Sequence, residues 1–158
     1  MKHLAMLVFS LCATLNAGLA TAEETPHYVA PQLSHAAYGE LKIVVPLTSA
    51  DPKVWQFKLG NIANALQQTA IFGGKLSVTV VSYGGGVLLL KQKDNEIAAF
   101  MQELRAGGVR FVVCNQSLKH MDVDFHTLNG VSEADIVPAG FLEVAWLQTQ
   151  NYKIDPMN

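Results

Sequence analysis

Short apolar runs recur along the chain and are separated by segments with helical spacing. Runs rich in Val, Ile and Leu are typical of buried strands, and four of them occupy residues 41–47, 76–81, 109–113 and 134–137. Residues 152–154 predict a last, short strand at the edge of the sheet. The runs are continuous rather than alternating, which indicates strands that are covered on both faces.

Amphipathic segments follow these runs. Asp51 and Pro52 form a helix-start signal, because Asp accepts hydrogen bonds from free N–H groups and Pro fits the first turn. Apolar residues then recur every three or four positions until the glycines at 73–74 end the pattern. The same reasoning predicts helices over residues 94–106 and 138–150, a short apolar turn or helix at 87–90, and a polar, broken helical pattern at 117–127.

Strand and helix alternate throughout, which predicts one doubly wound α/β domain with a parallel sheet and right-handed crossovers. Ligands of such open sheets bind beyond the carboxyl ends of the strands. Three of those ends carry residues 48–49, 82–84 and 114–115. We therefore expect any chemistry to come from these three loops.

The first 22 residues have the pattern of a secretory signal peptide. Lys2 is followed by an uncharged apolar run at 4–19, and Ala20-Thr21-Ala22 matches the small residues that precede a cleavage site. A membrane anchor is the alternative, but the run is shorter than the about 20 residues that a spanning helix needs. The sequence therefore predicts cleavage after Ala22 and a periplasmic or secreted protein.

Cleavage would remove Cys12 and leave Cys114 as the sole thiol of the mature chain. A lone cysteine cannot form a disulfide within one chain, so it is a free thiol, a buried bystander or an intermolecular partner. Residues 23–39 contain two prolines and no periodic apolar face, and we interpret them as an extended arm. The arm is either a solvated tail or a segment that packs on a neighbouring subunit.

Composition limits the classes of partner. Half of the 158 residues are apolar and 15% are charged, with a net charge of −2 and no basic run. Binding to nucleic acid or to an anionic membrane needs clustered Lys or Arg. We expect neither nucleic-acid binding nor membrane association of the mature chain.

Cys114 is the first candidate for chemistry, because it closes the third apolar run. If Ser117 or a neighbour opens a helix, the thiol lies near that helix's N-terminus, where N–H groups lower a thiol pKa and favour the reactive thiolate. Asn115 follows on the same loop. The alternative is a small hydrophobic side chain that fills the end of the sheet.

A glycine turn follows the second apolar run, at Tyr83-Gly84-Gly85-Gly86. Glycines at a strand end allow the backbone to approach a ligand closely, so Tyr83, Gly84 and Gly85 are candidate ligand-binding residues. The turn lacks the lysine and the spacing of nucleotide-binding loops. The competing interpretation is a tight strand-to-helix turn.

Residues 120–126 alternate as H-x-D-x-D-x-H. Imidazole and carboxylate groups can bind zinc, but no strand pattern brings the four side chains together, and a solvated loop is favoured over a metal site. His120 or His126 is also a candidate proton partner for Cys114. The pattern is formed by His120, Asp122, Asp124 and His126.

Four segments together resemble the DsrE/DsrF-like family, which includes the YchN-like proteins. They are LKIVVPLT, LSVTVVSYGGGVLLL, GGVRFVVCNQSL and ADIVPAGFLEVAWLQTQNY, and the similarity runs from about residue 40 to 155. The resemblance implies that residues 40–158 form a domain with a five-stranded parallel sheet. It also implies assembly into trimers or hexamers.

The resemblance further implies a function. Several members of the family relay sulfane sulfur on a cysteine as a persulfide, and Cys114 stands where the family often has that cysteine. Under this hypothesis a donor protein delivers sulfur to Cys114, an acceptor removes it, and no cofactor is needed; the protein is a carrier more than a turnover enzyme. The alternatives are a non-catalytic oligomeric module in which Cys114 only packs, and a ligand or metal binder that uses Tyr83 and residues 120–126.

Overall fold

The structure is a computed structural model that describes residues 28–155 and 157. The predicted signal peptide at 1–22, Cys12 and the start of the predicted arm lie outside these residues. The compact unit that holds every described helix and strand begins at Leu33. No helix within the described residues is long and apolar enough to cross a membrane.

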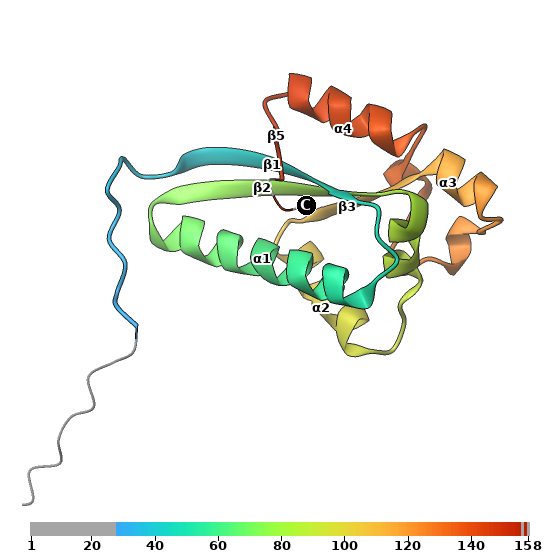
Figure 1. Ribbon diagram of the computed structural model, residues 1–158, viewed down its shortest axis with the longest axis horizontal. Coiled ribbons are helices and arrows are strands. Elements are labelled where there is room, and N and C mark those ends of the chain that lie inside the picture. The colour runs from blue at the N-terminus through green and yellow to red at the C-terminus, as the bar shows by residue number, and fades with distance from the viewer. Residues whose placement is uncertain (1–27, 156, 158) are drawn as a thin grey trace, which may run out of the picture. The chain divides into compact units, whose positions relative to one another are not determined.

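Five parallel strands form one sheet in the order β4-β3-β2-β1-β5, as Figure 1 shows. The prediction of a single α/β domain with a five-stranded parallel sheet is confirmed. β1 and β2 are the long central pair, and β5 is a short edge strand on β1, as the sequence predicted. The strands are β1 Gly39–Leu47, β2 Gly74–Ser82, β3 Arg110–Cys114, β4 Ile136–Val137 and β5 Lys153–Ile154.

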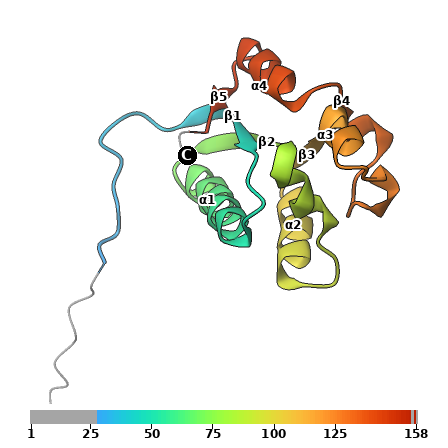
Figure 2. The ribbon, with the colours of Figure 1, turned by 45° about the vertical axis from the view of Figure 1, so that its right-hand side comes forward.

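Helices cover the two faces of the sheet unequally. α1 (Pro52–Ile71) and α2 (Glu96–Ala106) lie on one face, and α4 (Gly140–Thr149) lies on the other (Figures 1 and 2). The remaining helical turns lie near the carboxyl ends of the strands or in the loop before β4. They are η1 Gly84–Lys91, α3 Asn115–His120, η2 Phe125–Thr127 and η3 Glu133–Asp135.

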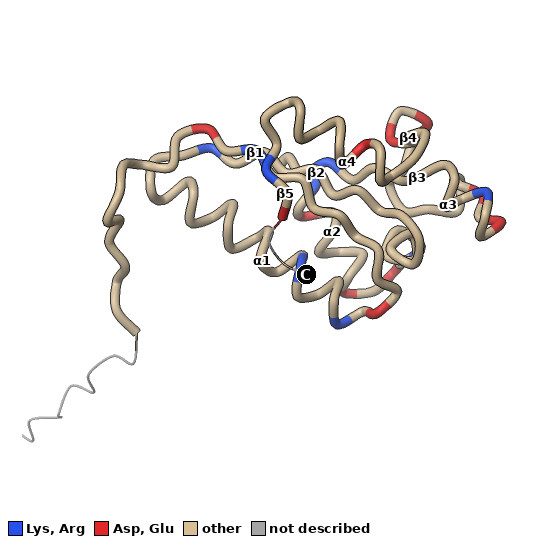
Figure 3. Tube along the Cα trace, turned by 45° about the horizontal axis from the view of Figure 1, so that its top comes forward, with Lys and Arg blue, Asp and Glu red and all other residues tan. Residues whose placement is uncertain are grey.

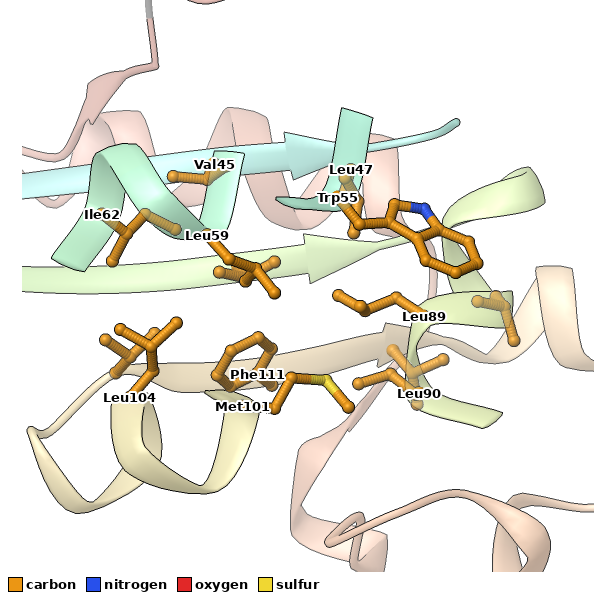
Figure 4. Close-up of a cluster of buried hydrophobic side chains, with 14 of the residues drawn as sticks. Val45, Leu47, Trp55, Leu59, Ile62, Leu89, Leu90, Met101, Leu104 and Phe111 are labelled. Atoms are coloured by element: carbon orange, nitrogen blue, oxygen red, sulfur yellow. The ribbon is translucent and has the colours of Figure 1, made fainter. Parts of the chain in front are cut away.

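Two apolar clusters hold these layers together. In the larger one, Trp55 and Leu59 of α1 and Met101 of α2 meet side chains of the sheet and of η1 (Figure 4). The smaller cluster lies between the sheet and α4. It consists of the buried residues Val44, Val81, Val112, Val137, Val144 and Leu147, with Tyr83 and Tyr152 packed against them.

Two helices begin later than the sequence predicted. Asp94 was expected to start α2, but its φ of 53° is not helical, and Asn95 caps the helix by accepting from the Ala98 N–H at 2.9 Å. α4 begins at Gly140 rather than at Pro138. Residues 138–139 instead connect β4 to the helix, which brings the first turn of α4 to the carboxyl edge of the sheet.

A buried ion pair ties the end of the chain to α1. Lys58 Nζ lies 2.7 Å from Asp155 Oδ2 and also donates to the Met157 carbonyl oxygen at 2.7 Å. The other Lys and Arg residues lie on several elements of the chain (Figure 3).

Candidate functional site

Cys114 is the last residue of β3 and also the N-cap of α3, because the helix begins directly after the strand. It is a free cysteine, and the residue is 4% exposed. Its Sγ atom accepts a hydrogen bond from the Ser117 backbone N–H at 3.4 Å. The thiol therefore occupies the place that an Asp or Ser side chain holds at most helix starts.

The Ser117 hydroxyl links the thiol to the glycine turn after β2. Its Oγ atom accepts a hydrogen bond from the Gly84 N–H at 2.9 Å, and the same hydroxyl group hydrogen-bonds to Cys114 Sγ. A serine hydroxyl can accept one hydrogen bond and donate another, so it can serve both groups at once. Two of the three predicted loops thus meet through one serine.

The first turn of α4 completes the surroundings of the thiol. Parallel pairing places Val137 of β4 beside Cys114, and the chain then leads to Gly140, whose N–H donates to Sγ. A Cβ atom on Gly140 would lie 2.7–2.8 Å from three atoms of Tyr83, so only glycine fits this contact. The half-buried Tyr83 therefore packs directly on the residue that holds the thiol.

The thiol lies at the carboxyl edge of the sheet, between helices that pack on opposite faces. α3 follows β3 and contributes Leu118 to the larger apolar cluster, whereas α4 follows β4 and packs through Val144 on the opposite face. Open α/β sheets bind their ligands beyond the carboxyl ends of their strands. Cys114 is therefore at the edge of the sheet where folds of this class usually carry a site.

Hydrogen bonds set the acidity of the thiol. Burial raises the pKa of Cys114, but the Ser117 hydroxyl and the N–H groups of Gly140, Ser117 and Gln116 outweigh it, so the pKa lies below its ordinary value. Each of these donors stabilises the thiolate more than the thiol. The site can therefore form the nucleophilic species at a lower pH than a free cysteine.

The pattern of the DsrE/DsrF-like family matches residues 49–154, which include the glycine turn, Cys114 and the first turn of α4. This chain belongs to the DsrE/DsrF-like family. No curated protein matches the chain. Among solved structures, the protein of unknown function MTH1491 from Methanobacterium thermoautotrophicum is similar, with a TM-score of 0.62 and 24% identity over 73% of this chain and 97% of that chain. That likeness shows the shared fold.

The other residues predicted to bind a ligand differ in whether they are linked to Cys114. Gly84 joins the thiol through Ser117, and Tyr83 joins it through Gly140. Gly85 lies instead against the loop after β1, where a Cβ atom would come within 2.9 Å of the Ala50 nitrogen. Asn115 opens α3, and its binding role stays a prediction.

The segment with alternating His and Asp does not close around one point. His126 Nδ1 lies 2.7 Å from Asp124 Oδ1, and the His126 side chain is 73% exposed. The pKa of Asp124 is lowered by hydrogen bonds from the backbone N–H and ring of His126. Within residues 28–155 and 157, no three His, Cys, Asp or Glu residues converge as metal ligands.

His120 and His126 are also absent from the groups that hydrogen-bond to Cys114 Sγ in the described part of the chain. His120 is an exposed residue at the end of α3. A role for either histidine as a proton partner stays a prediction, and no contact in the structure supports it.

Two residues of the site escaped the sequence analysis as thiol ligands. Ser117 could have been found from the sequence, because it lies three residues after Cys114. An N-cap side chain accepts a hydrogen bond from the backbone N–H at that spacing. Gly140 carries none, because it is 26 positions away and reaches the thiol only through the pairing of β4 with β3.

Proposed function

We propose that the protein is an exported sulfur carrier that takes up sulfane sulfur as a persulfide on Cys114 and passes it to a partner. The single observation that carries the proposal is the position of the thiol at the N-cap of α3, where Sγ accepts a hydrogen bond from the Ser117 N–H at 3.4 Å and the pKa of Cys114 lies below its ordinary value. Membership of the DsrE/DsrF-like family supports it. The proposed periplasmic or secreted location is based on the sequence pattern of residues 1–22.

The proposed transfer consists of two balanced exchanges. The Cys114 thiolate attacks the outer sulfur of a donor persulfide R–S–SH, an S–S bond to Cys114 forms, and the donor leaves as the thiolate R–S⁻. An acceptor thiolate then attacks the outer sulfur on Cys114, takes it as a new persulfide, and releases the Cys114 thiolate. Each step breaks one S–S bond and forms another, so there is no net oxidation or reduction. No cofactor or external oxidant is therefore required.

The donors around Sγ favour both steps. Before uptake, the Ser117 hydroxyl and the Gly140 N–H increase the fraction of thiolate available for attack. During release, Cys114 is the leaving group, and a thiol of lower pKa leaves faster. The same hydrogen bonds therefore serve the carrier in both directions.

Intact mass spectrometry of the mature protein after exposure to polysulfide tests the proposal. We expect the wild-type chain to gain the mass of one or more sulfur atoms, reversibly on treatment with a reductant. A Cys114→Ser variant is the matched control and should gain nothing. An unchanged wild-type mass, or equal addition to the variant, would refute sulfur uptake at this thiol.

The low exposure of Cys114 favours a second candidate function. At 4% exposure the residue fills the end of the sheet as a packing side chain would, and the fold would then serve as a non-catalytic oligomeric module. A thiol reagent separates the two candidates. Cys114 of a carrier is labelled in the native protein at mildly alkaline pH, whereas a packing cysteine is labelled only after unfolding.

A further inference from the structure

A pocket of about 270 Å³ is formed between α1 and the two central strands, β1 and β2. Figure 4 shows two of its side chains, Val45 of β1 and Ile62 of α1, in the space between the helix and the sheet. Most of its lining is aliphatic. The aliphatic lining consists of Ile43, Val45, Ile62, Ala65, Leu76 and Val78.

The order of side chains along α1 leaves this space. Lys58, Asn61 and Ala65 are spaced by three and four residues, so they lie along one side of the helix. Lys58 is long and reaches Asp155, whereas Asn61 and Ala65 are short and line the pocket. Leu59, on a neighbouring side of the helix, packs into the larger apolar cluster instead.

Asp155 and Met157 also line the pocket and close it on one side. Lys58 Nζ donates to Asp155 Oδ2 and to the Met157 carbonyl oxygen, both at 2.7 Å. The Asp155 N–H donates to the Val44 carbonyl oxygen of β1 at 2.8 Å. These hydrogen bonds hold the two residues across the space between α1 and β1. The Met157 side chain is unbranched and flexible, so it can adapt its shape to an occupant.

We infer that this pocket binds a short, uncharged aliphatic molecule that carries one hydrogen-bonding group, such as a hydroxyl. An aliphatic lining offers water few hydrogen-bond partners, so the pocket takes up an apolar chain in preference to water. Pockets for drug-sized ligands have volumes of about 300–1,000 Å³. At about 270 Å³, this pocket fits a shorter chain.

The polar groups of the pocket decide what the end of the ligand can be. Of the described residues that line the pocket, one is charged, Asp155, and its carboxylate is paired with Lys58. A charged end group would therefore be buried without a free counterion, which is costly. Asn61 contributes a side-chain amide, which can donate and accept a hydrogen bond. The pocket therefore fits a hydroxyl better than a carboxylate or an ammonium group.

The lining separates this pocket from the larger hollow at the start of α2. That hollow, of about 640 Å³, is lined by Lys93, Asp94 and Glu96 among other polar residues. Small-molecule sites are typically apolar with a few polar groups, as in the pocket beside α1 and not in this hollow. The pocket also shares no described lining residue with the surroundings of the thiol. The inference is therefore independent of sulfur transfer.

Titration of the mature chain with 1-octanol, followed by nuclear magnetic resonance of its methyl groups, tests the inference. We expect the signals of Ile43, Leu76 and Val78 to shift and to saturate, while Val144, on the other face of the sheet, stays unchanged. The melting temperature should rise with the concentration of 1-octanol, because a ligand that binds the folded chain stabilises it. Octanoate, which is charged at neutral pH, should bind at least about tenfold more weakly.

Ala65→Leu should fill the pocket with its own side chain. This variant should lose the methyl shifts and the rise in melting temperature with 1-octanol. Without 1-octanol it should melt no lower than the wild type, because it buries additional apolar atoms. Ala70→Leu is the matched control, because Ala70 is exposed on the same helix, and it should bind 1-octanol as the wild type does. Circular dichroism confirms that each variant is folded.

Four results would overturn the inference. They are a wild type whose pocket methyl signals do not shift, shifts of equal size at Val144, binding of octanoate as tight as that of 1-octanol, and saturable shifts that persist in folded Ala65→Leu. The first three are measured on the wild type, so they test the inference whether or not a variant folds.

Discussion

The hydroxyl of Ser117 stands between the thiol of Cys114 and the N–H of Gly84, and it is 2.9 Å from the latter nitrogen. One side chain therefore contacts the glycine turn and also contributes to the acidity of the thiol. Because Cys114 is also the N-cap of α3, loss of the hydroxyl should change thiol chemistry more than it changes the fold.

Ser117→Ala should slow the reaction of the Cys114 thiol with an alkylating reagent at neutral pH by about tenfold. A hydrogen bond to a charged group contributes about 1.5 kcal/mol or more, and its loss raises the pKa of Cys114 and lowers the thiolate fraction. Rates measured over a range of pH give the shift directly. Ser132→Ala is the control, because the Ser132 hydroxyl donates to Asp135 at 2.7 Å instead, and an equal effect there would contradict the assignment.

The lowered pKa of Cys114 also predicts how stability depends on pH. The unfolded thiol has its ordinary pKa, so the stabilisation is fully present above that pKa and is lost as the pH falls through the lower folded pKa. The free energy of unfolding of the wild type, minus that of Cys114→Ala, should therefore increase toward alkaline pH. A difference that stays constant with pH would show that the hydrogen bonds do not favour the thiolate.

Gly140→Ala should destabilise the protein by about 1–3 kcal/mol, because the new methyl group overlaps Tyr83. Gly60→Ala is the matched control: Gly60 lies inside α1 with no atom within 4 Å of a Cβ, and alanine should stabilise the helix by about 0.5–1 kcal/mol. Urea unfolding measures both. Replacing Tyr83 with Ala in the Gly140→Ala background should recover part of the loss, and no recovery would mean that another contact is responsible.

Lys58→Met should destabilise the protein by about 3–5 kcal/mol, because it leaves the Asp155 carboxylate buried without a charged partner. The Asp155 side chain is 1% exposed, so water cannot replace the ammonium group. The double variant Lys58→Met with Asp155→Leu should recover most of the loss in urea unfolding. Lys53→Met, on the exposed side of the same helix, should change the stability little.

Replacement of either histidine that was considered as a proton partner should leave the thiol unchanged. His126 is paired with Asp124 and is 73% exposed, and neither His120 nor His126 is among the donors to Sγ in the described residues. His120→Ala and His126→Ala should therefore keep the wild-type profile of alkylation rate against pH. A shifted profile in one variant would restore that histidine as a proton partner.

The elements and their order could be predicted from the amino-acid sequence, because the signals involved are local. Apolar runs marked the strands, Asp51 and Pro52 marked the start of α1, and the run that ends at Cys114 located the thiol at the carboxyl end of β3. Helix starts were less certain, since Asp94 and Asn95 are both suitable caps and only the backbone at Asp94, with its positive φ, decides between them.

The surroundings of the thiol, in contrast, depend on tertiary packing. The pairing of Val137 with Cys114 brings Gly140 to Sγ, and the crossing of α4 to the other face leaves Trp146 on the outside. Neither result follows from local spacing, because contacts between residues far apart in sequence depend on strand order and on the face to which each helix crosses. Local sequence patterns therefore predict that Cys114 ends a strand, whereas tertiary packing determines the neighbours and the acidity of its thiol.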